Sequence, residues 1–218
     1  MKMYLLTLSL FVFSCGNSST QNPSKEETAK AKPVEIPVQH NKARAYFASG
    51  CFWCVEAIYE SVDGVEEVIS GYSGGHTKNP TYEASNTGKT GHAEAVEVIY
   101  NPKKVDFATL ARVYFGSQDP TQVKGQGPDN GSQYRSIIFY QNQEQKKIIE
   151  DIKAEVAKNY DKPIAAEVVP FQKFWRAEDY HQNYEKLHPD NPYIQNVSIP
   201  RIEKFKKKFP ELLKKHSE

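Results

Sequence analysis

The hydrophobic period changes within ARAYFASGCFWCVEAIYE, residues 43–60, and this change limits the folds open to the chain. Residues 43–49 alternate Ala and Arg with aromatic residues, which is the period of a strand. From residue 52 the apolar positions are 52, 55, 58, 59 and 62, which is helical spacing. Gly50 supplies the turn, so we expect Cys51 where a strand becomes a helix. Backbone N–H groups and the helix dipole meet there, and both favour a thiolate.

Further strands are predicted within residues 62–75, 92–100, 134–141 and 164–171. Helices are predicted over 105–117 and 142–160, with Asp106 and Asn142 as N-caps, and two more over 177–187 and 200–215. The order β-α-β-β-α-β-α-β predicts an α+β domain: a split-βαβ plait with helices packed on a mixed or antiparallel sheet, and extra C-terminal helices.

The N-terminus has the layout of an exported protein. Residues 1–14 combine a lysine, an apolar run and small residues, as in a signal peptide, and Cys15 follows as in a bacterial lipoprotein. Cys15 is the expected lipidation site, and an ordinary signal with an incidental cysteine is the alternative. Residues 15–40 read as a lipidated, disordered tether. We expect a lipid-anchored protein at a bacterial membrane that faces the periplasm or the exterior.

The folded region is expected to span residues 41–200, followed by a basic C-terminal helix over 201–218 that forms a solvated face or a membrane-surface contact. The 218 residues suffice for one domain with tails. The charge is nearly balanced, with 28 basic and 27 acidic residues, so composition suggests no nucleic-acid partner. No stretch approaches the roughly 20 apolar residues of a membrane-spanning helix.

Three cysteines are present, and lipidation of Cys15 leaves Cys51 and Cys54 in the folded region. One pair makes no disulfide framework. Zinc usually needs four ligands, and no second C-x-x-C or H-x₃₋₅-H follows, so no metal site is predicted. A redox couple, a nucleophile with a helper, and simple packing remain open at this point.

Glu94 is a candidate general acid. Strand alternation places it on the same face as Val96, Val98 and Tyr100. A carboxylate on this mostly apolar face loses solvation, which raises its pKa and lets it hold a proton for catalysis. Alternatively, Glu94 lies beyond the end of the strand and is solvated.

Six segments together resemble the peptide methionine sulfoxide reductase A family, over about residues 43–200. They are GCFWCVE (50–56), GYSGGHTKNPTYE (71–83), TGHAEAVEVIY (90–100), DPTQ (119–122), GPDNGSQYRS (127–136) and EDYHQNY (178–184). The resemblance implies that Cys51 attacks the sulfoxide sulfur, releases methionine and becomes a sulfenic acid. It makes Glu94 the proton donor, with Tyr82 and Tyr134 bonding the sulfoxide oxygen.

The same resemblance assigns the substrate-binding residues. Phe52 and Trp53 form the apolar cup for the S-methyl group, and Asp129 recognises the substrate backbone. From the residues alone, Phe52 and Trp53 also suit an ordinary core, and Asp129 suits a turn with Asn130 and Gly131. The implied substrates are oxidised proteins and free methionine sulfoxide, as the S epimer, and the implied enzyme is a monomer without a bound cofactor.

Many members of the family recycle through a cysteine in a C-terminal tail, whereas the tail of this chain has none. The resemblance therefore implies that Cys54 resolves the sulfenic acid in a Cys51–Cys54 disulfide. Three residues along a helix separate Cα atoms by about 5 Å, which disulfides allow. A thioredoxin-like dithiol is then the expected external reductant and partner.

Three other classes of protein remain as alternatives. A C-x-x-C thiol–disulfide oxidoreductase would need neither Glu94 nor the two tyrosines. A cysteine hydrolase would pair Cys51 with a histidine and would not need Cys54. A non-catalytic lipoprotein that binds partners through aromatic residues would tolerate the loss of Cys51.

Overall fold

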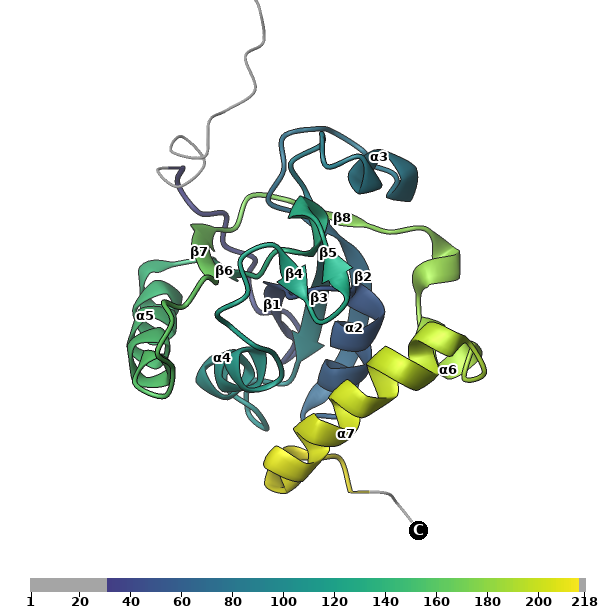
Figure 1. Ribbon diagram of the computed structural model, residues 1–218. Helices are drawn as coiled ribbons and strands as arrows, with labels where there is room; N and C mark the ends of the chain where they lie inside the picture. The colour runs from purple at the N-terminus through teal and green to yellow at the C-terminus, as the bar shows by residue number, and fades with distance from the viewer. Residues whose placement is uncertain (1–30, 216–218) are drawn as a thin grey trace, which may run out of the picture.

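A computed structural model describes residues 31–215 (Figure 1). Its six-stranded sheet has the order β7-β6-β1-β3-β2-β8. The strands and helices are, in chain order, β1 Ala43–Ala48, α2 Phe52–Glu60, β2 Val65–Ser73, α3 Tyr82–Asn86, β3 Ala93–Tyr100, α4 Phe107–Gly116, β4 Gly125–Gln126, β5 Asp129–Asn130, β6 Ile137–Tyr140, α5 Gln143–Ala157, β7 Glu167–Pro170, β8 Phe174–Arg176, α6 Tyr184–Leu187 and α7 Ile199–Lys208.

The centre of the sheet has the predicted split-βαβ topology. Strand β1 pairs antiparallel with both β3 and β6, and β2 pairs antiparallel with β3. The connections β1-α2-β2 and β3-α4-β6 carry the two helices of the plait. Strand β7 joins β6 in parallel, and β8 joins β2 antiparallel, so the complete sheet is mixed. The predicted α+β fold is confirmed.

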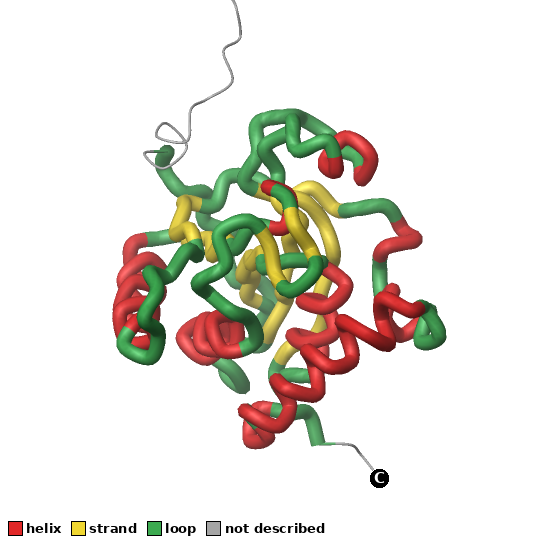
Figure 2. The backbone as a smooth tube through the Cα atoms, in the orientation of Figure 1, coloured by secondary structure: helices red, strands yellow, loops and turns green. Residues whose placement is uncertain are grey.

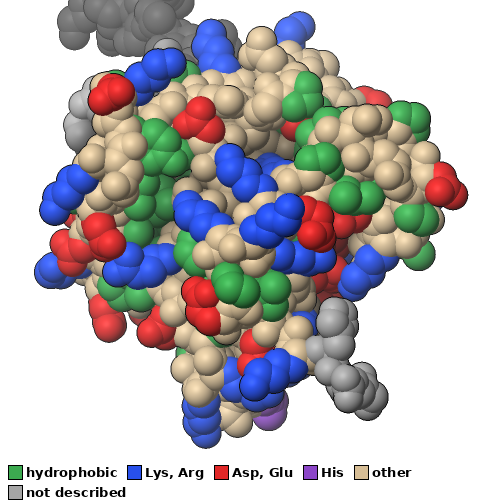
Figure 3. All heavy atoms as spheres, turned by 60° about the horizontal axis from the view of Figure 1, so that its bottom comes forward, with side chains coloured by type: hydrophobic (Ala, Val, Ile, Leu, Met, Phe, Trp, Pro, Cys, Tyr) green, Lys and Arg blue, Asp and Glu red, His purple; other side chains and the backbone are tan. Residues whose placement is uncertain are grey.

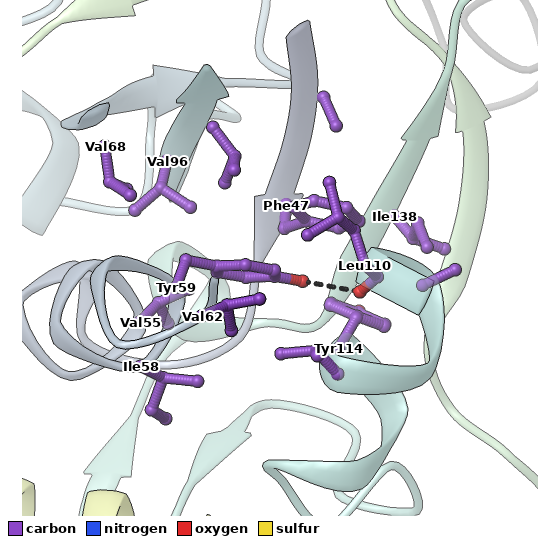
Figure 4. Packing of buried hydrophobic residues seen from close by; sticks show 14 of the residues in the cluster. Phe47, Val55, Ile58, Tyr59, Val62, Val68, Val96, Leu110, Tyr114 and Ile138 are labelled. Carbon is purple, nitrogen blue, oxygen red and sulfur yellow. Dashed lines mark hydrogen bonds between the residues drawn. The ribbon is translucent and has the colours of Figure 1, made fainter. Parts of the chain in front are cut away.

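Helices α2, α4, α5 and α7 all contribute to one core on a single face of the sheet. Figure 1 shows α5, α4 and α7 across the lower half of the molecule, and Figure 2 shows the strands gathered behind them. The core side chains of α2 and α4 meet those of the sheet in Figure 4, where the Tyr59 hydroxyl donates to the Leu110 carbonyl at 3.0 Å. The predicted apolar face of α2, residues 52, 55, 58, 59 and 62, is entirely buried.

Helices α4 and α5 begin at the predicted caps. The side chain of Asp106 accepts a hydrogen bond from the Thr109 N–H at 2.7 Å, and that of Asn142 accepts one from the Gln145 N–H at 2.9 Å. Each cap satisfies an N-terminal amide that the helix itself leaves unpaired. These helix starts are therefore local properties of the sequence.

A smaller apolar cluster covers the opposite face of the sheet. Tyr46 of β1 stacks on Phe171 with ring centroids 3.7 Å apart, and Ala93, Ala95 and Phe139 pack beside them. Because Ala93 and Ala95 point to this cluster, Glu94 and Val96 point to the helical face, as the alternation predicted.

Three predictions of secondary structure need correction. Residues 177–187 do not form one helix: a 3₁₀ turn over Asp179–His181 and the short α6 are separated by Asn183, whose φ of 55° lies in the left-handed region. The strand predicted from residue 134 begins at Ile137, because Ser132–Tyr134 form a 3₁₀ turn. The last helix ends at Lys208, just before Pro210, whose missing N–H and fixed φ do not allow continuation.

Helix α7 belongs to the domain. It begins at Ile199, so the boundary expected at residue 200 falls inside a helix, and its Ile202 and Phe205 are buried in the main core. Its last turn carries Lys206, Lys207 and Lys208. The face shown in Figure 3, which brings the lower side of Figure 1 forward, mixes Lys and Arg side chains with acidic and apolar ones.

The predicted signal peptide, Cys15 and residues 15–30 of the tether lie outside the described residues. Within residues 31–215 no helix has the length and apolar character needed to cross a membrane.

Candidate active site

The antiparallel pairings bring the candidate residues to one end of the sheet. The C-terminal ends of β1 and β2 lie beside the N-terminal ends of β3 and β6, as the pairs Ala48↔Ile137 and Ser73↔Ala93 show. Cys51 follows β1, Glu94 is the second residue of β3, and Tyr134 precedes β6. The connection from β2 to β3 carries α3 with Tyr82, and the β4–β5 hairpin carries Asp129.

Cys51 sits at the predicted strand-to-helix turn. Gly50 has a φ of +75°, and its N–H donates to the Tyr134 carbonyl at 3.1 Å. A Cβ at residue 50 would lie 2.7 Å from Cβ of Gln126, so the turn has no room for a side chain. Cys51 is the N-cap of α2, and both it and Cys54 are buried free thiols.

Glu94 reaches the first turn of α2 from the neighbouring strand. Its Oε2 accepts a hydrogen bond from the Phe52 N–H at 3.0 Å, which places the carboxyl group beside Cys51. The side chain is 2% exposed, and burial raises its pKa to about 8, with further upward contributions from Asp129 and Cys54. The prediction of a buried carboxyl with a raised pKa is confirmed, so Glu94 holds a proton at neutral pH.

The two thiols interact with each other, and their pKa values move in opposite directions. The interaction with Cys51 and the electrostatic attraction of Arg201 together lower the pKa of Cys54 to about 7, although burial opposes them. Burial raises the pKa of Cys51, and the nearby Cys54 and Glu94 raise it as well. The prediction that the helix N-terminus favours a thiolate at Cys51 is therefore wrong for the resting pair, because desolvation outweighs the dipole.

Tyr82 and Tyr134 approach the same thiol from two different connections. Their side chains interact with each other, and both interact electrostatically with Cys51 and Glu94. Burial raises the pKa of both phenols. The two hydroxyl groups stay protonated at neutral pH and can donate hydrogen bonds to an oxygen bound beside Cys51.

Asp129 is paired with Tyr193, a residue that the sequence analysis missed. The Tyr193 hydroxyl donates to Asp129 Oδ2 at 2.7 Å and lies 3.8 Å from the sulfur of Cys54. Asp129 is therefore more than a turn residue, since it links the β4–β5 hairpin to the chain before α7. The chain has 13 tyrosines, and Tyr193 lies in a segment without a recognisable motif, so no sequence signal distinguishes it.

Phe52 and Trp53 face an aromatic cluster built by the 178–184 segment. The Trp53 ring stacks on Tyr184 at 3.7 Å, and its Nε1–H donates to His181 Nδ1 at 3.2 Å. The His181 ring in turn lies 4.8 Å from the Phe52 ring and 4.6 Å from the Tyr82 ring, centroid to centroid. Phe52 is buried in the core and Trp53 is half-buried, so Trp53 is the one of the pair with exposed surface.

Glu178 and Glu56 hold this segment in place. Glu178 accepts from the Tyr72 hydroxyl and from the Tyr82 N–H, each at 2.9 Å. Glu56, buried in α2, accepts from the Asn183 N–H at 3.0 Å, and burial raises its pKa to about 7. The EDYHQNY motif was one of the segments that carry the family resemblance, but only the structure shows that it is hydrogen-bonded to α2 and α3.

Two cavities are lined in part by residues of the site, and neither has Cys51 or Cys54 in its wall. One of about 540 Å³ includes Trp53 and Glu56 in its wall, and another of about 670 Å³ is lined by Asp129 and Arg201. Across the described part of the chain, no group of three or more His, Cys, Asp or Glu side chains is placed to hold a metal ion.

The fold and these contacts define a class of protein, namely an α+β oxidoreductase. Its chemistry centres on a buried pair of thiols beside a neutral carboxylic acid and two phenols. The acid and the phenols all surround Cys51, so an oxygen atom near that sulfur would meet proton and hydrogen-bond donors on several sides.

Comparison with known proteins identifies the family. The family model described as peptide methionine sulfoxide reductase matches residues 43–213. Peptide methionine sulfoxide reductase MsrA of Thermus thermophilus is 47% identical over 78% of this chain and 97% of its own length. The enzyme of Saccharolobus solfataricus is 45% identical over 79% of this chain and 97% of its own. The chain belongs to the peptide methionine sulfoxide reductase family.

Solved structures agree with this assignment. Methionine sulfoxide reductase A of Corynebacterium diphtheriae superposes with a TM-score of 0.63 at 32% identity, covering 76% of this chain and 91% of that one. Reduced Mxr1 of Saccharomyces cerevisiae superposes with a TM-score of 0.64 at 30% identity, covering 73% and 91%.

Proposed function

We propose that the protein reduces the S epimer of methionine sulfoxide, peptide-bound or free, to methionine. Membership of the family supports the reaction type, and the arrangement around Cys51 supports the mechanism. In the net first step one oxygen atom passes from the methionine sulfur to the sulfur of Cys51. The products are methionine and a sulfenic acid on Cys51.

The observation that carries the proposal is the position of Glu94. Oε2 of Glu94 accepts from the amide that follows Cys51, so the carboxyl group lies beside the attacking sulfur. With a pKa raised to about 8 by burial, the group is protonated at pH 7 and can protonate the departing sulfoxide oxygen. Thiol–disulfide exchange has no departing oxygen for this acid to protonate.

Each other site residue has a place in the proposal. Tyr82 and Tyr134 donate hydrogen bonds to the sulfoxide oxygen, and the interaction between the two thiols lets Cys54 take the proton as Cys51 attacks. Trp53, together with Phe52, contacts the S-methyl group, and Asp129 accepts from the substrate backbone. An uncharged sulfoxide is well matched by an aromatic site with donors aimed at one oxygen.

Recycling is proposed to use Cys54. Cys54 loses the proton that it took from Cys51 as its sulfur attacks the sulfur of the sulfenic acid. The departing hydroxide takes up this proton and leaves as water, and a Cys51–Cys54 disulfide forms. A thioredoxin-like dithiol then reduces that disulfide and is itself oxidised. The interaction between the two buried thiols supports this pairing.

Mass spectrometry after a single turnover tests the mechanism. Wild type and Cys54→Ser are each mixed with a racemic methionine sulfoxide peptide without reductant, both in a Cys15→Ser background. Wild type should release one methionine per chain and lose two hydrogens. With the peptide in excess, Cys54→Ser should release the same amount but gain one oxygen on Cys51. In a second mixture with the enzyme in excess, half of the racemic peptide should stay oxidised. Absence of methionine release from wild type would refute the reductase mechanism.

We further propose that the protein is exported and anchored by a lipid on Cys15. The sequence of residues 1–15 supports this, although these residues lie outside the described part of the structure. The proposal predicts that the full chain sediments with membranes and carries the lipid mass on Cys15, whereas Cys15→Ser stays in the supernatant. Equal partitioning of the two forms would contradict it.

A further inference from the structure

Arg201 of α7 lies beside the thiol pair without an acidic partner. Its guanidinium donates to the Ser49 carbonyl at 2.9 Å, to the Ser49 hydroxyl at 2.8 Å and to the Ser117 carbonyl at 3.0 Å. All three acceptors are neutral, and no carboxylate among residues 31–215 forms an ion pair with Arg201. The guanidinium is thus bonded to Ser49, which is two residues before Cys51 in the chain, and no negatively charged side chain in the described residues pairs with it.

Two hydroxyl groups, those of Tyr193 and Ser198, also lie near Cys54. Tyr193 donates its single hydroxyl proton to Asp129, and Ser198 donates its own to Glu185. Both hydroxyl groups also interact with Cys54, and each contributes to lowering the pKa of its thiol. Arg201 adds a positive charge beside these neutral groups, and after the larger contribution of Cys51 its attraction lowers the pKa of the Cys54 thiol further.

Access distinguishes the two sulfurs as well. Cys51 is 6% exposed, at the turn where the tyrosines meet, whereas Cys54 is 1% exposed, within α2 and against α7. In disulfide exchange the incoming thiolate needs access to one sulfur, and the other sulfur leaves faster when its thiol has a lower pKa. The greater exposure of Cys51 and the positive charge near Cys54 thus both favour attack on Cys51 with Cys54 as the leaving group.

We propose that the external reductant attacks Cys51 and that Arg201 acts as a positioning residue that holds the departing Cys54 thiolate. This inference rests on the Cys51–Cys54 disulfide of the proposed function. The electron pair of the incoming thiolate forms the new bond to Cys51, and the pair of the old S–S bond goes to Cys54. The second thiol of the reductant then loses its proton and displaces Cys51, which takes up a proton. The reductant ends as a disulfide and the enzyme gains two electrons.

The direction of attack can be read by trapping. The full chain with Cys15→Ser is oxidised with one equivalent of methionine sulfoxide peptide, and its mass confirms or refutes the loss of two hydrogens. Glutathione is then added, released thiols are alkylated with iodoacetamide, and fragmentation locates both labels. Glutathione on Cys51 and alkylation on Cys54 are expected. Glutathione on Cys54 overturns the inference and leaves the proposed function intact, whereas a chain without the disulfide overturns both.

The role of Arg201 is tested with Arg201→Met and Arg201→Lys. The methionine variant loses the charge, and the lysine variant keeps it without the forked hydrogen bonds. For every pH unit by which the pKa of Cys54 rises, reduction by glutathione should slow about threefold, if the leaving group shows a sensitivity like that of the attacking thiol. Arg201→Met should show this slowing and Arg201→Lys little of it.

A purely structural role would give a different pattern. The pKa of Cys54 is followed by thiolate absorbance against pH, with Cys15→Ser and Cys51→Ser added to each variant so that one thiol remains. We expect a higher pKa in Arg201→Met than in Arg201→Lys. Equal pKa values in the two variants, even with lower thermal stability in both, would overturn the role assigned to Arg201.

Discussion

Replacing Glu94 by Gln should stabilise the protein more strongly as the pH rises. The unfolded chain loses the Glu94 proton near pH 4.5, whereas the folded protein holds it until about pH 8. Between these values the unfolded state binds fewer protons, so the stability of wild type falls as the pH rises. The full span of about 3.5 pH units corresponds to about 5 kcal/mol. Gln removes this penalty because it mimics the neutral acid and still accepts from Phe52.

Urea unfolding under reducing conditions measures the effect. From pH 5 to pH 8, the free energy of unfolding of Glu94→Gln minus that of wild type should increase by about 3.5 kcal/mol. Glu56→Gln is the matched control, because Glu56 is also buried but has a pKa of about 7. The free energy of unfolding of Glu56→Gln minus that of wild type should stop increasing at a pH about one unit lower than for Glu94→Gln. A Glu94 difference that stays constant with pH would show that this carboxyl group is ionised in the folded protein.

Three further changes test the packing around the site. Gly50→Ala should cost about 1–3 kcal/mol more stability than Gly127→Ala in thermal unfolding, since both glycines have positive φ but only the Cβ at residue 50 meets another atom within 4 Å. Leu110→Ala should lower the free energy of unfolding by about 2–5 kcal/mol, while the same measurement on Val123→Ala, which is 71% exposed, should change by less than about 0.5 kcal/mol. Tyr193→Phe should cost about 1.5–3 kcal/mol near neutral pH, because it removes a hydrogen bond to a charged carboxylate. An unchanged urea midpoint for this variant would mean that solvent replaces the bond.

The sequence alone determined the features that depend on neighbouring residues. The strand-to-helix turn at Gly50 and the caps at Asp106 and Asn142 were predicted and are present. The side of β3 that carries Glu94 was also predicted, because alternation along a strand is a local property. The order of these elements was enough to predict the plait.

The tertiary structure decided which distant residues meet. Only the pairing of β1 with β3 and β6 brings Glu94 and Tyr134 to Cys51, and only the packing of α7 brings Arg201 to Ser49, which lies 152 positions earlier in the chain. Left-handed Asn183 breaks a helix that local periodicity predicts, where its N–H is bound by buried Glu56.

The charge state of the thiols depends on that packing as well. A helix N-terminus favours a thiolate at Cys51, but this is a local effect, and burial by the surrounding elements opposes it. The interaction with Cys51, helped by the positive charge of Arg201, then places the lower pKa on Cys54. Desolvation and long-range electrostatics arise only once distant segments are packed together, so the sequence could identify the two cysteines but not their ionisation.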